Sequence, residues 1–124
     1  AVVATTFTKI KLSGSTDGLG ILVDDNATAG KTIHTGPTDT DQMDEVWIYA
    51  ANYDTTDRKL TIEYGTASAG GIIEQTITAE AGLTLVIPGL IIVGNGSPKV
   101  IAAFAATTSA IQLFGYANRI DVSP

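Results

Sequence analysis

Short runs of β-branched and aromatic residues, separated by turn residues, recur along the whole chain and limit what it can fold into. Nine runs can be counted, at residues 6–12, 20–23, 31–35, 45–52, 59–64, 72–78, 84–93, 100–106 and 111–119. The segments between them are rich in Gly, Asn, Asp and Ser, which favour turns. Short strands at this spacing are typical of a sandwich or barrel. We therefore predict an all-β, single-domain antiparallel β-sandwich of eight or nine strands. A jelly-roll-like order of the strands is one of the arrangements that this prediction allows.

Alternation within the runs indicates which side of each strand is buried. Leu60, Ile62 and Tyr64 alternate with Thr61 and Glu63, so one face of this strand is predicted to be dry. The stretch at residues 100–106 does not alternate, and its alanines would also suit a helix. We favour a strand because the surrounding sequence is rich in β-formers, and we expect this strand to be covered on both faces.

The length and the lack of Cys bear on the organisation of the chain. Its 124 residues are the usual size of one domain, and disulfides cannot staple it. We expect the β-sandwich domain to span residues 9–124. Residues 1–8 are predicted to form either an N-terminal arm or an edge strand of the same domain. As an arm, this segment would dock on a neighbouring subunit through Val2, Val3 and Phe7, the residues that we expect to form the interface; an edge strand of the same chain would explain their apolar character equally well.

The chain is poor in charged residues. Asp, Glu, Lys and Arg make up 16% of it, against about 25% in an average soluble domain. An uncharged surface costs little to desolvate, which favours an assembly component over an enzyme. The net charge of −6 and the seven scattered Lys and Arg argue against nucleic acid as a partner. No membrane partner is expected, because the apolar stretch at residues 83–93 is short and is broken by Pro88 and Gly89.

Residues that could carry out catalysis or bind a metal are few. The single His, His34, has no neighbour in sequence to orient it, so we interpret it as a residue on a sheet face or at an interface. The acidic run from Asp39 to Glu45 is the best candidate for a Ca²⁺ site. It lacks both the Gly and the terminal Glu of an EF-hand loop, so we favour a solvated loop.

Glu63 and Glu74 are a second candidate pair. If the strands on either side of residues 67–71 formed a symmetric hairpin, the two carboxylates would face each other about 5 Å apart. That separation approaches that of a retaining glycosidase pair or of two ligands of one cation. Exposed Glu side chains commonly pair with Lys instead, so we assign no catalytic, cofactor-binding or metal-binding residues.

The large aromatic residues could line a sugar-binding platform; they are Trp47, Tyr49, Tyr53, Tyr64 and Tyr116. We expect them to belong to the core instead. In residues 46–49, large side chains occupy both faces of the strand, so one side needs cover that an opposing sheet and a partner subunit would supply. Burial of the rings would remove sugar binding, whereas an ordered stack on the solvent side would favour it.

A series of local motifs follows one another along nearly the whole chain. They are Lys11-Leu12-Ser13-Gly14-Ser15-Thr16-Asp17-Gly18, Thr32-Ile33-His34-Thr35, Asp44-Glu45-Val46-Trp47-Ile48-Tyr49-Ala50, Arg58-Lys59-Leu60-Thr61-Ile62-Glu63-Tyr64-Gly65, Ile73-Glu74-Gln75-Thr76-Ile77, Val86-Ile87-Pro88-Gly89-Leu90 and Gly115-Tyr116-Ala117-Asn118-Arg119-Ile120. With this series the sequence resembles small proteins encoded among the virion structural genes of tailed bacteriophages. The resemblance implies a decoration or cement protein on the capsid exterior, often a trimer at local symmetry axes, and it brings no catalytic residues.

We therefore expect a non-enzymatic structural virion protein that binds the outside of a phage head. It would self-associate, as a homotrimer, and stabilise the shell by bridging subunits of the major capsid protein. Binding only to the assembled shell would stabilise that shell by mass action. Two alternatives stay open, namely a phage tail or baseplate structural protein and a carbohydrate-binding adhesion module. A hydrolase based on Glu63 and Glu74 is the least favoured alternative.

Overall fold

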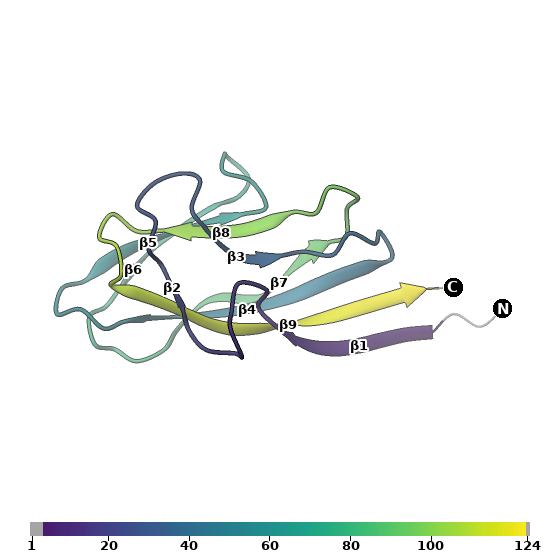
Figure 1. Cartoon of the computed structure of the whole chain (residues 1–124), viewed down its shortest axis with the longest axis horizontal. Helices are drawn as coiled ribbons and strands as arrows, with labels where there is room; N and C mark the ends of the chain where they lie inside the picture. Colours follow the sequence, from purple (N-terminus) through teal and green to yellow (C-terminus); the bar gives the residue numbers. More distant parts are fainter. Residues whose placement is uncertain (1–3, 124) are drawn as a thin grey trace.

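The computed structural model describes residues 4–123, which form nine strands in two antiparallel sheets (Figure 1). The strands are β1 (Ala4–Lys11), β2 (Ile21–Leu22), β3 (Lys31–Thr35), β4 (Gln42–Asn52), β5 (Arg58–Tyr64), β6 (Ile72–Ile77), β7 (Thr84–Val93), β8 (Val100–Phe104) and β9 (Ile111–Ser123). Sheet A has the order β1-β9-β4-β7, and the short β2 also pairs with β9. Sheet B has the order β3-β8-β5-β6. The described residues include no helix that could cross a membrane.

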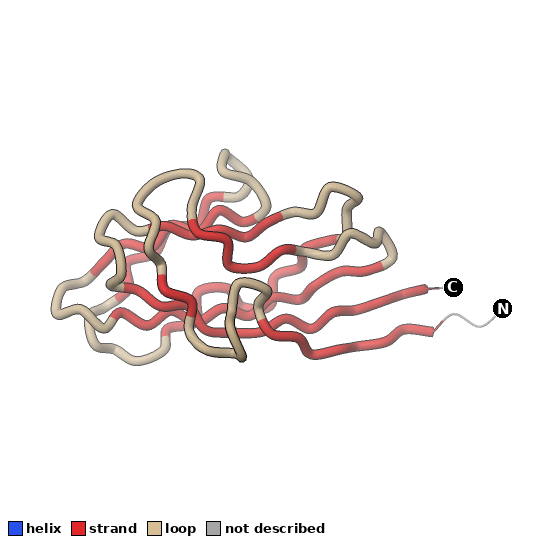
Figure 2. Tube along the Cα trace, in the orientation of Figure 1, coloured by secondary structure: helices blue, strands red, loops and turns tan. Residues whose placement is uncertain are grey.

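From β2 onwards, strands early in the chain pair with strands late in the chain, and the pairs close in on β5 and β6. β2 pairs with β9, β3 with β8, β4 with β7, and β5 with β6, and all of these pairs are antiparallel. The pairs are nested around the β5–β6 hairpin, so the chain is one long double strand rolled into two layers (Figure 2). This is the jelly-roll form of a β-sandwich. The predicted fold class is therefore confirmed.

All nine predicted runs form strands, although several boundaries differ by a few residues. The strands at residues 31–35 and 84–93 have the predicted bounds. The non-alternating stretch is strand β8, not a helix, and it lies in the middle of sheet B between β3 and β5. It ends at Phe104 rather than at residue 106. Ile101, Ala102 and Ala103 are buried, which explains the lack of alternation.

The hydrophobic core fills the space between the two sheets. Val46, Ile48 and Ala50 of β4 point into it from sheet A, and Leu60 and Ile62 of β5 point into it from sheet B. All five are 0% or 1% exposed. Strand alternation therefore leaves the intervening residues of β4 on the opposite, outward side of sheet A.

Candidate functional site

His34 lies inside the sandwich. The sequence had predicted only that it would lie on a sheet face or at an interface. Its side chain is 1% exposed, and its Nε2 atom lies 2.7 Å from Oδ2 of Asp44, whose side chain is 0% exposed. Arg119 donates from Nε and Nη2 to the two oxygens of the same carboxylate, at 2.8 and 2.9 Å. The partner that orients His34 comes from β4 in the other sheet, so the local sequence could not reveal it.

The hydrogen bonds of His34 limit what its ring can do. The backbone N–H of Ser13 donates to Nδ1 at 3.0 Å, so Nε2 carries the hydrogen that bonds to Asp44 in the neutral ring. Both ring nitrogens are thus occupied in a buried position, and neither is available to take a proton from a nucleophile. This His–Asp pair connects the two sheets and does not form a catalytic dyad.

The acidic run from Asp39 to Glu45 is only partly the solvated loop that we predicted. Asp39 and Asp41 are exposed, but β4 begins at Gln42, and Asp44 is a buried strand residue. Burial alone would raise the pKa of Asp44, but hydrogen bonds from His34 and Arg119 and attraction to Arg119 outweigh it and hold this pKa below 3.8. Within residues 4–123, no group of three or more acidic, His or Cys side chains could hold a metal ion.

The symmetric hairpin that would set Glu63 opposite Glu74 does not form. Glu63 lies opposite Ile72, and Glu74 lies opposite Thr61, because the turn after β5 is longer than a symmetric hairpin around residues 67–71 would have. Glu74 is exposed and pairs with Lys59, with 2.9 Å between Oε2 and Nζ. Glu63 is 3% exposed and bonds to the backbone of Gly30. Each carboxylate therefore has a partner of its own, and the directly opposed pair that a symmetric hairpin would give does not form.

Of the three predicted interface residues, the structure describes Phe7, which lies at the edge of sheet A. Val2 and Val3 lie outside the described residues. Phe7 belongs to β1, which pairs with β9 along its whole length, so residues 4–8 form an edge strand and not an arm. The side chain of Phe7 is 70% exposed. An exposed Phe on an edge strand is available to contact another molecule.

The aromatic residues were predicted to lie in the core, and for most of them this is wrong. Trp47 and Tyr49 of β4 and Tyr116 of β9 are half-buried on the outward side of sheet A. Tyr53 is 56% exposed, and its hydroxyl donates to the carbonyl of Ser109. Only Tyr64 packs against the core, where burial and the charge of Asp44 raise its pKa to about 12.

Strand register extends the outward residues of β4 into a continuous surface. Directly opposite residues of antiparallel strands lie on the same face, so one row crosses the sheet from Phe7 through Ile120 and Met43 to Val93. The outer face of sheet A includes Phe7, Lys9 and Lys11 from β1, Met43, Glu45, Trp47 and Tyr49 from β4, Leu85, Ile91 and Val93 from β7, and Phe114, Tyr116, Asn118 and Ile120 from β9. Most of these side chains are apolar or aromatic.

Hydrogen bonds and ring contacts hold the centre of this face in place. The indole Nε1 of Trp47 and the amide of Asn118 both donate to Oε1 of Glu45, at 3.0 Å each. These two bonds lower the pKa of Glu45. The rings of Trp47 and Tyr116 lie nearly parallel, with centroids 6.5 Å apart, and Nζ of Lys9 sits 4.7 Å from the centroid of Tyr116. The indole N–H of Trp47 and the amide of Asn118 already have an acceptor in Glu45, so covering them costs little further hydrogen bonding.

The margins of the outer face carry the most exposed apolar side chains. Leu85, Ile91 and Val93 of the edge strand β7 are 42%, 43% and 56% exposed. Sequence reasoning named Phe7 but missed these residues, as well as Phe114 and Ile120 of β9. Large residues on both faces of residues 111–120 were the available signal, since a strand with one wet face would show a polar residue at every second position.

Comparison of the chain with protein-family models, with curated proteins and with solved structures found no match.

Proposed function

We propose that this protein is a structural virion protein, a capsid decoration or cement protein that docks on the outside of a phage head through the outer face of sheet A. The observation that carries the proposal is the continuous apolar and aromatic surface across β1, β9, β4 and β7. Contiguous apolar patches of this kind mark interaction surfaces in soluble proteins. Aromatic residues and Met are also the types enriched where proteins bury surface against one another.

Three features support a virion as the setting. The series of local motifs in the sequence is the basis for expecting a phage virion structural protein, and the chain is poor in charged residues, at 16%. Jelly rolls occur among viral capsid domains, although they also occur among lectins, so the fold alone does not decide the function. In this proposal the partner is the major capsid protein, and the location is the capsid exterior.

Self-association, as a homotrimer, is part of the same proposal. Self-association needs a second surface beside the one that docks on the shell. We propose that this second surface is the edge formed by Leu83 and strand β7, where Leu83 and Leu90 are 60% and 40% exposed. β7 is an edge strand of sheet A, so contacts along it would also cover its unpaired backbone groups.

Co-sedimentation with expanded capsids that lack the protein tests the proposal. Ile91→Thr removes an apolar contact from the outer face of sheet A, and Ile72→Thr is a matched control because Ile72 is equally exposed, at 42%, on the edge strand β6 of sheet B. We expect saturable binding of the wild type to capsids, weaker binding of Ile91→Thr, and unchanged binding of Ile72→Thr. Absence of capsid binding by the wild type would contradict the proposal.

Two further preparations in the same experiment separate the alternatives. Empty tails test the tail or baseplate function, which would use the same surface chemistry. Insoluble polysaccharides test a carbohydrate-binding module, which one specific observation favours: the parallel pair of Trp47 and Tyr116 is ordered on the outward side of the sheet. Flat aromatic surfaces next to fixed polar groups suit sugar rings. Binding to polysaccharide alone, abolished by Trp47→Ala, would replace the cement function with this one.

A further inference from the structure

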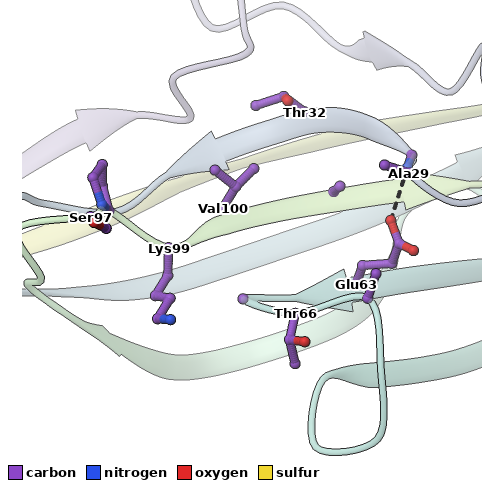
Figure 3. Close-up of a pocket in the computed structure, with 12 residues that line it drawn as sticks. Ala29, Thr32, Glu63, Thr66, Ser97, Lys99 and Val100 are labelled. Carbon is purple, nitrogen blue, oxygen red and sulfur yellow. Dashed lines mark hydrogen bonds between the residues drawn. The ribbon is translucent and has the colours of Figure 1, made fainter.

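A pocket with a volume of about 440 Å³ lies on the outward side of sheet B, away from the face that we propose to dock on capsids (Figure 3). Val100 and Ala102 of β8 contribute to its lining, and the register Thr32–Ala102–Glu63 runs across it from β3 to β5. The loop before β3 and the turns at residues 65–67 and 97–99 complete its walls. Its volume falls in the range of about 300–1,000 Å³ that is usual for small-molecule sites.

Glu63 is the distinctive group in this pocket. Its side chain is 3% exposed, and its Oε1 accepts a hydrogen bond from the backbone N–H of Gly30 at 2.8 Å. Its Oε2 is also buried, yet it has no hydrogen-bond partner among the described residues. A buried carboxylate oxygen without a donor is costly, and carboxylates form their strongest hydrogen bonds with charged N–H donors. This oxygen therefore lacks a donor, and an ammonium group that reached it would supply one.

The remaining lining residues define the rest of the ligand. Lys99 lies at the opposite end of the pocket from Glu63 in Figure 3, and Thr32, Thr66 and Ser97 contribute hydroxyl groups. A second positive charge on the ligand would be repelled by Lys99, whereas an anionic or neutral polar end would be accepted there. The pocket thus suits a ligand with one ammonium group.

We propose that the Glu63 pocket binds a primary ammonium group, with Oε2 of Glu63 accepting its hydrogen bond. The group could belong to a free ω-amino acid or to the lysine side chain of another protein. The proposal does not depend on capsid binding, because the pocket and the outer face of sheet A lie on different sheets.

The test is an NMR titration that follows the backbone amide of Gly30 in the full-length protein. The probes are 4-aminobutyrate for a free amino acid, N-acetyl-lysine methylamide for a protein side chain, and n-butanol as an uncharged control. We expect saturable shifts of the Gly30 amide with at least one ammonium probe and none with n-butanol. The tighter of the two ammonium probes identifies the source, and Lys99→Gln weakens binding of 4-aminobutyrate only.

Two substitutions at the pocket and one control complete the design. Glu63→Gln keeps an oxygen that can accept from Gly30 but removes the charge, so we expect it to weaken ammonium binding at least about tenfold, the value of one charged hydrogen bond. Thr32→Tyr fills the pocket from β3 while the Glu63 side chain itself is unchanged, and it should also abolish binding. Glu74→Gln is the matched control, because Glu74 is exposed and paired with Lys59. No saturable shift with either ammonium probe, or equal binding by Glu63→Gln, would overturn the proposal.

Discussion

The imidazole of His34 in β3 and the carboxylate of Asp44 in β4 are 2.7 Å apart, so one buried hydrogen bond joins the two sheets of the sandwich. Arg119 of β9 binds both oxygens of the same carboxylate. Asp44 and Arg119 lie opposite each other on neighbouring strands of sheet A, and His34 reaches them from sheet B. The bond between His34 and Asp44 therefore forms only when the sheets have packed face to face.

Asp44→Asn should destabilise the fold. The substitution removes the charge that Arg119 pairs with and one of the acceptors that this network needs. Removing one partner of a buried ion pair costs about 3 kcal/mol or more, and we expect a loss of this size in the free energy of unfolding measured with urea. Asp41→Asn, at an exposed position before the same strand, should change it by less than about 0.5 kcal/mol. Similar losses in both variants would contradict this interpretation.

Stability should fall with acidification in a way that depends on Asp44. The fold holds the pKa of Asp44 below 3.8, its usual value, so the ionised carboxylate is favoured in the folded state. The resulting stabilisation is complete above 3.8 and is lost as the pH falls through the lower, folded-state pKa. The difference in unfolding free energy between the wild type and Asp44→Asn should therefore be constant near neutral pH and shrink in acid. A difference that grows on acidification would show that the sign is wrong.

Gly115→Ala should disrupt the pairing of β4 with β9. A Cβ atom at Gly115 would run into the carbonyl oxygen of Trp47 on the facing strand, and that backbone atom has no room to move aside. We expect a loss of about 2–3 kcal/mol, typical of overpacking. Gly96→Ala is the matched control, since nothing lies within 4 Å of a Cβ there. Thermal unfolding of the two variants tests the difference, and equal melting temperatures would refute it.

Trp47 should report on docking directly. It is the single Trp of the chain and lies half-buried at the centre of the outer face of sheet A. Covering the indole ring with protein removes it from water, so its fluorescence should shift to shorter wavelength when the protein binds capsids. The expected shift is absent with Ile91→Thr at concentrations where that variant fails to bind. An unshifted spectrum at full capsid occupancy would place the contact elsewhere on the molecule.

Phe7→Ser should reduce capsid occupancy without unfolding the domain. Phe7 is 70% exposed, so its loss should change the unfolding free energy by less than about 0.5 kcal/mol. A point substitution is preferable to deletion of residues 1–7, because residues from Ala4 onwards pair with β9 and their removal would expose that strand. Ile72→Ser is a suitable control, since Ile72 is 42% exposed on strand β6 of sheet B and not on sheet A. Unchanged occupancy of Phe7→Ser would remove Phe7 from the proposed interface.

Much of the fold could be predicted because its signals are local. Alternating β-branched residues and the Gly, Asn and Asp turns between them determined all nine strands, and the apolar character of β8 placed that strand inside a sheet. These features depend on neighbouring residues, whose spacing is visible in the sequence. The dual-faced apolar pattern of β4 likewise indicated that this strand needed cover on its second side.

The candidate sites depended on longer-range geometry. The β5–β6 register placed Glu74 opposite Thr61, and the loop ending at Gly30 buried Glu63, so two similar carboxylates acquired different environments. The partner of His34 came from the opposite sheet. Local patterning by itself determined where the strands form and which residues alternate along them. Only the tertiary structure decided which strands lie side by side, and with them which polar groups are paired and which apolar face is left uncovered, because register and sheet packing are set by contacts between residues far apart in the chain.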